Sequence, residues 1–133
     1  MSLRRDVVIL ACAVSAGIHG ALAPAHFDEG AGAGIAFIVS AAVLAGLTLW
    51  LTQRSAGLLP SAVAALVFAG LLASYALATT IGVPVLHPEP EPVDGLALAT
   101  KAFELVGLVT ALSLLRRRPA ISLPLIQPKG TLT

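Results

Sequence analysis

The chain has few charged side chains, few aromatic ones and a single cysteine. Only 11% of its 133 residues are Asp, Glu, Lys or Arg and 5% are Phe, Trp or Tyr, whereas 57% are apolar. The mean hydropathy of +0.94 lies far outside the range of soluble globular domains. We therefore expect an integral membrane protein that is solvated by the lipid bilayer and has no nucleic-acid partner.

The lone cysteine, Cys12, excludes a disulfide within the chain. It falls in an apolar run, where we expect it to act as a small apolar residue of a helix. The same run follows Arg4 and Arg5 and ends with Ala21-Leu22-Ala23, a pattern that is also typical of a secretory signal peptide. Cleavage of this first segment therefore stays open as an alternative.

Four apolar segments are long enough to cross the hydrocarbon core of a bilayer. We expect them as helices at about residues 7–24, 35–52, 58–81 and 95–115. The first has about 18 residues and would be roughly 27 Å long. Pro24 lacks an amide proton, so we expect this helix to kink or end there and the turn to begin near Ala25. Gly30 to Gly34 have little helix propensity and are expected to precede the second helix.

The remaining segments contain helix breakers. Residues 82–94 are rich in proline, which removes backbone donors and favours an extended strap. This strap forms an outer acidic loop with one histidine: His87, Glu89, Glu91 and Asp94. A solvated loop explains these residues, and cation capture is the alternative. Residues 119–133 have three prolines and are expected as a flexible cytoplasmic tail after a four-helix domain at residues 1–118.

The basic residues fall on one side of this arrangement. The loops at residues 25–34 and 82–94 contain no Lys or Arg. Outside the fourth helix, the basic residues lie at the opposite helix ends: Arg4, Arg5, Arg54, Arg116, Arg117, Arg118 and Lys129. The positive-inside rule then predicts an all-α, four-helix up-down membrane bundle in the cell membrane, with both termini cytoplasmic and the polar loops extracytoplasmic.

Two charged residues fall inside the fourth apolar segment. Lys101 and Glu104 are three residues apart, so they share one helix face. Charges within a membrane span are costly unless they are paired, and we expect a buried ion pair directed into the bundle. Tyr75, in the third span, is expected as an interface aromatic whose hydroxyl reaches a carbonyl or water. A ligand-binding role for Tyr75 is the alternative.

Two histidines suggest a candidate site at the outer end of the first helix. His19 lies within the apolar run, and His26 and Glu29 follow Pro24. With Glu104 they form a candidate extracytoplasmic site for Cu or Zn, or for a proton, because imidazole and carboxylate groups suit these metals. On a continuous helix the histidines would lie about 10 Å apart, beyond shared coordination. The metal hypothesis therefore needs a chain that turns back after Pro24.

Several of these residues also carry a resemblance. The shared pattern comprises His19, Pro24-x-His26, Glu29, Gly82-x-Pro84, Glu89-Pro90-Glu91-Pro92 and a glutamate in the last helix. It is similar to uncharacterised small four-helix integral membrane proteins of actinobacterial type and covers most of the chain. The resemblance implies the fold and names no activity.

Three classes of function remain open. The composition favours an accessory or structural subunit of a larger membrane complex, with a membrane-protein partner or a second copy of the chain. The alternatives are the metal or proton site and a small transporter in which Lys101 and Glu104 form a gated pair. An enzyme acting alone is not indicated, because there is no nucleophile with a matching base and no nucleotide fingerprint.

Reporter fusions test the predicted topology. Fusions placed after Thr133 and next to Arg54 should both report from the cytoplasm, because moving either basic segment outward opposes the charge bias. A fusion at Asp28 should report from the other side of the membrane and is the matched control. An extracytoplasmic signal from either of the first two positions would contradict the predicted topology.

Overall fold

The chain folds into four α-helices. The structure is a computed structural model that describes residues 2–53, 57–83 and 90–116. The helices are α1 (Leu3–Glu29), α2 (Ala31–Thr52), α3 (Leu59–Thr80) and α4 (Gly95–Leu115). Each is long and apolar enough to cross a membrane. This confirms the expected all-α class with four apolar helices.

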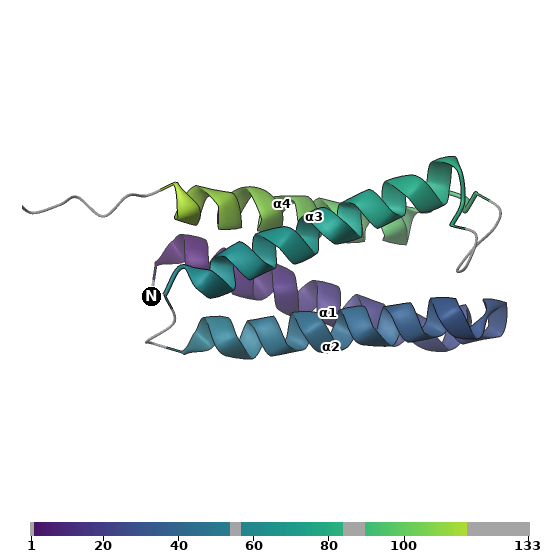
Figure 1. The fold of residues 1–133 in the computed structure, drawn as a ribbon, viewed down its shortest axis with the longest axis horizontal. Coiled ribbons are helices and arrows are strands. Elements are labelled where there is room, and N and C mark those ends of the chain that lie inside the picture. Colours follow the sequence, from purple (N-terminus) through teal and green to yellow (C-terminus); the bar gives the residue numbers. More distant parts are fainter. Residues whose placement is uncertain (1, 54–56, 84–89, 117–133) are drawn as a thin grey trace, which may run out of the picture.

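The helices form two antiparallel hairpins that lie as two layers (Figure 1). Gly30 alone separates α1 from α2, whereas residues 81–94 connect α3 to α4. Between the layers, α1 packs mainly against α4, and α2 makes only limited contact with α3. The layers lie close together at one end and spread apart at the other (Figure 1).

Arginine side chains join the helices at the closed end. Arg5 Nε donates to the Leu51 carbonyl at 2.6 Å, and its guanidinium also donates to the Gln53 carbonyl. The last carbonyls of a helix lack partners within the helix and carry partial negative charge, so a guanidinium is well placed there. Arg4 Nη1 donates to Ser113 Oγ at 3.5 Å. We call this the arginine end, and the opposite end, which holds the two hairpin connections, the loop end.

The buried apolar core fills the arginine-end half of the bundle. It comprises Val8, Ala11, Cys12, Leu44, Leu47, Leu51, Ala64, Ala65, Phe68 and Ala111. These residues come from the first halves of α1 and α3 and from the second halves of α2 and α4. In the loop-end half the buried apolar side chains are those of Ala23 and Ala33, so large apolar side chains are buried only in the arginine-end half of the described bundle.

The buried face of α4 carries small and polar residues. Its buried residues are Thr100, Glu104, Gly107 and Ala111, which recur at the spacing of one helix face. At Gly107 a β-carbon would lie 2.5 Å from the Phe68 ring and 2.9 Å from the Ala11 β-carbon. Glycine at this position therefore lets α4 approach both α1 and α3 closely.

The first helix continues through Pro24, which corrects the expected turn near Ala25. The helix extends to Glu29, and the chain turns at Gly30. Pro24 is exposed, so its ring does not obstruct packing between α1 and α2. In a bilayer each backbone polar group needs a partner within the protein, and continuing the helix supplies partners beyond the one bond that Pro24 removes.

The second helix begins at Ala31 rather than at Ile35. Residues 31–34, which were expected to precede this helix, are therefore part of it. A β-carbon at Gly34 would coincide with the ring of Phe27, so glycine allows this aromatic ring of α1 to lie directly against α2. Close packing between the two helices outweighs the low helix propensity of the segment.

Several expected features lie outside the described residues. They are the tail at 119–133 and His87, Glu89, Arg54, Arg117, Arg118 and Lys129. One residue of the expected strap, Glu91, donates its backbone amide to the Ala78 carbonyl at 3.0 Å. This bond attaches the strap to the end of α3. Asp94 Oδ1 accepts from the Ala97 amide at 2.7 Å and caps the start of α4.

A Gly107→Ala variant tests the close approach of α4. The added methyl group should displace Phe68 or α4 and lower the free energy of unfolding by about 1–3 kcal/mol. Gly70→Ala is the matched control, because nothing lies within 4 Å of a β-carbon there. It should be neutral or stabilising by up to about 1 kcal/mol. Equal stability of both variants in thermal denaturation in detergent would show that α4 is not packed so closely.

Candidate functional site

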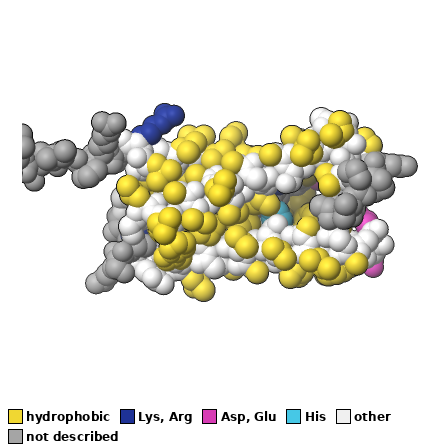
Figure 2. Space-filling view, viewed as in Figure 1, with side chains coloured by type: hydrophobic (Ala, Val, Ile, Leu, Met, Phe, Trp, Pro, Cys, Tyr) yellow, Lys and Arg dark blue, Asp and Glu magenta, His cyan; other side chains and the backbone are white. Residues whose placement is uncertain are grey.

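A cavity of about 270 Å³ lies between the two hairpins in the loop-end half. It is lined by all four helices and by those strap residues that the structure describes, and most of its wall is apolar. Its polar lining includes His19, His26, Ser40, Ser74, Tyr75, Glu91, Asp94, Thr100 and Lys101. Figure 2 shows a histidine side chain inside the hollow between the two layers. The cavity thus places polar groups inside an otherwise apolar half of the bundle.

Glu104 lies beneath the cavity and is fully buried. Its Oε2 accepts from Lys101 Nζ at 2.7 Å, and its Oε1 accepts from Ser15 Oγ at 3.0 Å. A buried carboxylate needs both a counter-charge and hydrogen bonds. Lys101 of α4 supplies the counter-charge, and Ser15 of α1 supplies a hydrogen bond. We call Ser15, His19, Lys101 and Glu104 the Glu104 cluster.

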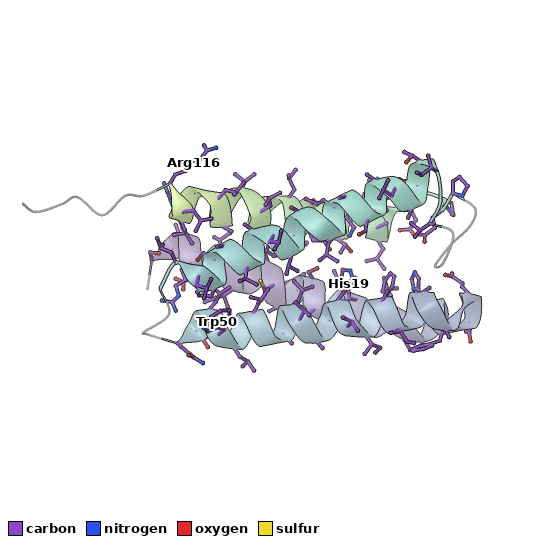
Figure 3. All side chains as sticks on the ribbon, in the orientation of Figure 1. His19, Trp50 and Arg116 are labelled. Carbon is purple, nitrogen blue, oxygen red and sulfur yellow. The ribbon has the colours of Figure 1, made fainter. Side chains whose placement is uncertain are left out.

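His19 completes the cluster from α1. Its Nδ1 lies 2.9 Å from the Ser15 carbonyl oxygen, which can only accept, so Nδ1 carries a proton. The other ring nitrogen, Nε2, lies 3.9 Å from Glu104 Oε1. Figure 3 shows His19 between the two layers of the bundle. The histidine is therefore held by its own helix and directed at the carboxylate.

Tyr75 covers the ammonium group of the cluster. Lys101 Nζ lies 5.3 Å from the centroid of the Tyr75 ring, within the range of a cation–π contact. The side chain of Lys101 is only 16% exposed. The Tyr75 hydroxyl oxygen is buried, and no carbonyl of the described residues accepts from it.

His26 lies farther toward the loop end on the same side of α1. Its Nδ1 donates to the Leu22 carbonyl at 3.0 Å, and its Nε2 lies 4.0 Å from Glu29 Oε2. Its ring stacks on Phe37 at a centroid distance of 3.6 Å, and the centroid of His19 lies 5.2 Å from the same ring. The two histidines therefore contact one aromatic side chain of α2 and both line the cavity.

The residues considered as a metal ligand set form two separate pairs, His19 with Glu104 and His26 with Glu29. The reason is that α1 stays helical through Pro24, so the chain does not turn His26 back toward His19. Within residues 2–53, 57–83 and 90–116 no three His, Cys, Asp or Glu side chains are grouped to hold a metal ion. The metal hypothesis is therefore not supported.

Ser15 is the member of the cluster that sequence reasoning missed. It precedes His19 by four residues, so the two share one face of α1. That spacing is the only signal in the sequence, because a serine in an apolar helix commonly bonds its own backbone. The structure instead directs its hydroxyl proton to a carboxylate on another helix.

Comparison of the chain with protein-family models, curated proteins and solved structures finds no match. Its class therefore follows from its own four apolar helices, which define a small multi-pass integral membrane protein. Within that class, its particular feature is the buried Glu104 cluster beneath a cavity that all four helices line.

Replacing one member of the pair Lys101 and Glu104 should cost more than replacing both. Glu104→Gln or Lys101→Met leaves one charge without its partner and should lower the free energy of unfolding by about 3 kcal/mol. The double variant removes both charges and should lose less. Thermal denaturation in detergent measures the difference, and wild-type stability in both single variants would show that the two side chains are not coupled.

Proposed function

We propose that this protein is a four-helix up-down bundle of the cell membrane that binds one proton at the Glu104 cluster, taken from the extracytoplasmic side. The termini are cytoplasmic and the loop end is extracytoplasmic in this proposal. The observation that carries it is the pair of facing acceptors, His19 Nε2 and Glu104 Oε1, 3.9 Å apart.

The distribution of charge supports the orientation. Arg4, Arg5 and Arg116 lie at the arginine end, together with Asp6 in the first turn of α1. Four acidic residues lie at the loop end, in the last turn of α1 and just before α4: Asp28, Glu29, Glu91 and Asp94. Figure 2 shows the two signs of charge at opposite ends of the bundle. Basic residues flanking spans are retained in the cytoplasm, so the arginine end is assigned to that side.

The tautomer of His19 supports a proton as the ligand. Because Nδ1 donates to the Ser15 carbonyl, a neutral ring directs the lone pair of Nε2 toward a carboxylate oxygen. Two acceptors repel each other in a site of low dielectric. A single added proton converts them into a donor and an acceptor, on whichever of the two groups it resides.

The charges of the cluster explain why this proton is exchangeable rather than permanent. With Lys101 protonated, Glu104 ionised and His19 neutral, the charges of the cluster sum to zero. An added proton gives a net charge of +1, which a low-dielectric interior opposes. The attraction between donor and acceptor and the cost of the net charge act in opposite directions, so occupancy depends on the proton concentration at the cavity.

The groups that face the cluster come from each packed element. His26 and Glu29 lie above it on α1, Tyr75 faces it from α3, and Glu91 and Asp94 line the cavity at its loop end. On α2, Phe37 and Ser40 line the cavity, and neither is charged. The carboxylates at the loop end favour the approach of a cation from that side.

Nitrogen NMR of histidine-labelled protein tests proton binding, because the chain has only three histidines. On acidification, the His19 resonance should change from a ring protonated at Nδ1 alone to an imidazolium that is hydrogen-bonded to Glu104. In Glu104→Gln this uptake should be lost in the same pH range, because the facing carboxylate is gone while the Lys101 charge remains.

Asp28→Asn is the matched control, since it removes an exposed carboxylate at the loop end. It should leave the His19 titration in place. A His19 signal that behaves identically in wild type and Glu104→Gln would exclude a shared proton site.

A further inference from the structure

A second cleft lies at the arginine end, between the start of α1 and the end of α4. Its volume is about 330 Å³, and its lining residues are Arg4, Val109, Leu112, Ser113 and Arg116. Figure 3 shows Arg116 at the end of α4, on the surface of the bundle. The lining shares no residue with the cavity of the loop-end half. We call it the arginine cleft.

Two guanidinium groups border the arginine cleft on either side of Ser113. Arg4 Nη1 donates to Ser113 Oγ at 3.5 Å, a long bond that uses one of the five N–H donors of the guanidinium. Ser113 Oγ donates its own proton to the Thr110 carbonyl at 2.7 Å. Arg116 has a helical backbone and follows Ser113 by three residues, so it lies on the same face of α4. Both guanidiniums therefore have donors left for an added acceptor.

The arginine cleft carries two positive charges without a nearby counter-charge. Among the described residues, no ion pair includes Arg4 or Arg116. The adjacent Arg5 is bonded to carbonyl oxygens at the end of α2. Asp6 lies two residues after Arg4, which places it about 200° around the helix and away from the cleft. An anion is the ligand that these charges attract.

Apolar side chains continue the arginine cleft along α4 into the membrane. Leu112 and Val109 precede Arg116 by four and seven residues, so they share its helix face, and Val109 lies roughly 10 Å deeper. They are 40% and 59% exposed, so both face the bilayer rather than the bundle core. Positive charge at the end of a membrane span and an apolar surface beneath it match the headgroup and the acyl chain of a lipid.

We propose that the arginine cleft binds one anionic phospholipid from the leaflet at the arginine end. The lipid phosphate accepts hydrogen bonds from Arg4 and Arg116, and an acyl chain lies along Leu112 and Val109. Arginine suits this role, because its planar set of N–H donors matches phosphate oxygens in pairs. The bound lipid would thereby connect the first helix to the last.

The lining selects an anionic headgroup over the other carriers of phosphate. A zwitterionic headgroup adds an ammonium group, which is stabilised by a carboxylate or an aromatic ring, and the lining supplies neither. A free phosphate ion would leave the exposed apolar residues of the cleft uncovered. Proton binding at Glu104 is not involved, because the arginine cleft and the Glu104 cluster share no residue. The two proposals can therefore fail separately.

Three phosphate-containing probes test the ligand class. They are dioctanoyl phosphatidylglycerol, which is anionic, dioctanoyl phosphatidylcholine, which is zwitterionic with the same chains, and inorganic phosphate. A scintillation proximity assay measures binding of the radiolabelled anionic lipid to the immobilised protein in mild detergent, with the other two probes as competitors. The anionic lipid should bind saturably at one molecule per chain. Phosphatidylcholine should compete more weakly than the unlabelled anionic lipid, and inorganic phosphate at the same concentration should not compete.

Arg4→Gln and Arg116→Gln remove one charge each from the arginine cleft. Each should lower the affinity for phosphatidylglycerol about fivefold, the effect of one basic residue near an anionic lipid. Without lipid, the thermal stability of Arg116→Gln should equal that of the wild type, because its side chain has no bonding partner within the described residues.

Asp6→Asn is the matched control, because it changes the charge of the arginine end by the same amount outside the cleft. It should leave the affinity for phosphatidylglycerol unchanged. The proposal would be overturned by a lack of saturable binding, by equal affinities for the two lipids, or by displacement of the lipid with inorganic phosphate. Unchanged affinity in both arginine variants would also overturn it, as would a rise in Asp6→Asn as large as their loss.

Discussion

The buried carboxylate of Glu104 constrains the rest of the bundle. A carboxylate with no solvent exposure is stable only if charge and hydrogen bonds are supplied locally, and here α1 and α4 both supply them. The bond from Ser15 joins residues 89 positions apart, so it fixes the register of the first helix against the last. Gly107, one turn farther along α4, permits the close approach that this short bond requires.

The two halves of the bundle differ in how tightly their side chains pack. The arginine-end half is packed, and side chains such as Leu44 and Phe68 are completely buried there. The loop-end half holds the cavity and its polar lining. Outside the bundle, exposed apolar residues such as Leu49 and Leu66 suit acyl chains and a partner helix equally well. The role of an accessory subunit therefore stays a prediction.

The sequence predicted the features that depend on composition alone, namely the helical spans and the charged pair within one of them. The long apolar runs permit only helices in a bilayer, and Lys101 and Glu104 stand out because a span rarely carries charges. Sequence could not place the end of the first helix, because Pro24 is tolerated when a neighbouring helix packs alongside and its ring lies outward. It also could not identify Ser15, whose partner depends on packing between the first and last helices.

The unequal packing of the two halves has an electrical consequence. In the proposed orientation, a water-filled cavity would leave less of a transmembrane voltage across the loop-end half than across the packed arginine-end half. Moving one elementary charge across the full voltage takes about 2.3 kcal/mol per 100 mV, but a proton that reaches Glu104 through the cavity would cross only a small part of it. The chemical concentration of protons, rather than the voltage, would then set how often the cluster is occupied.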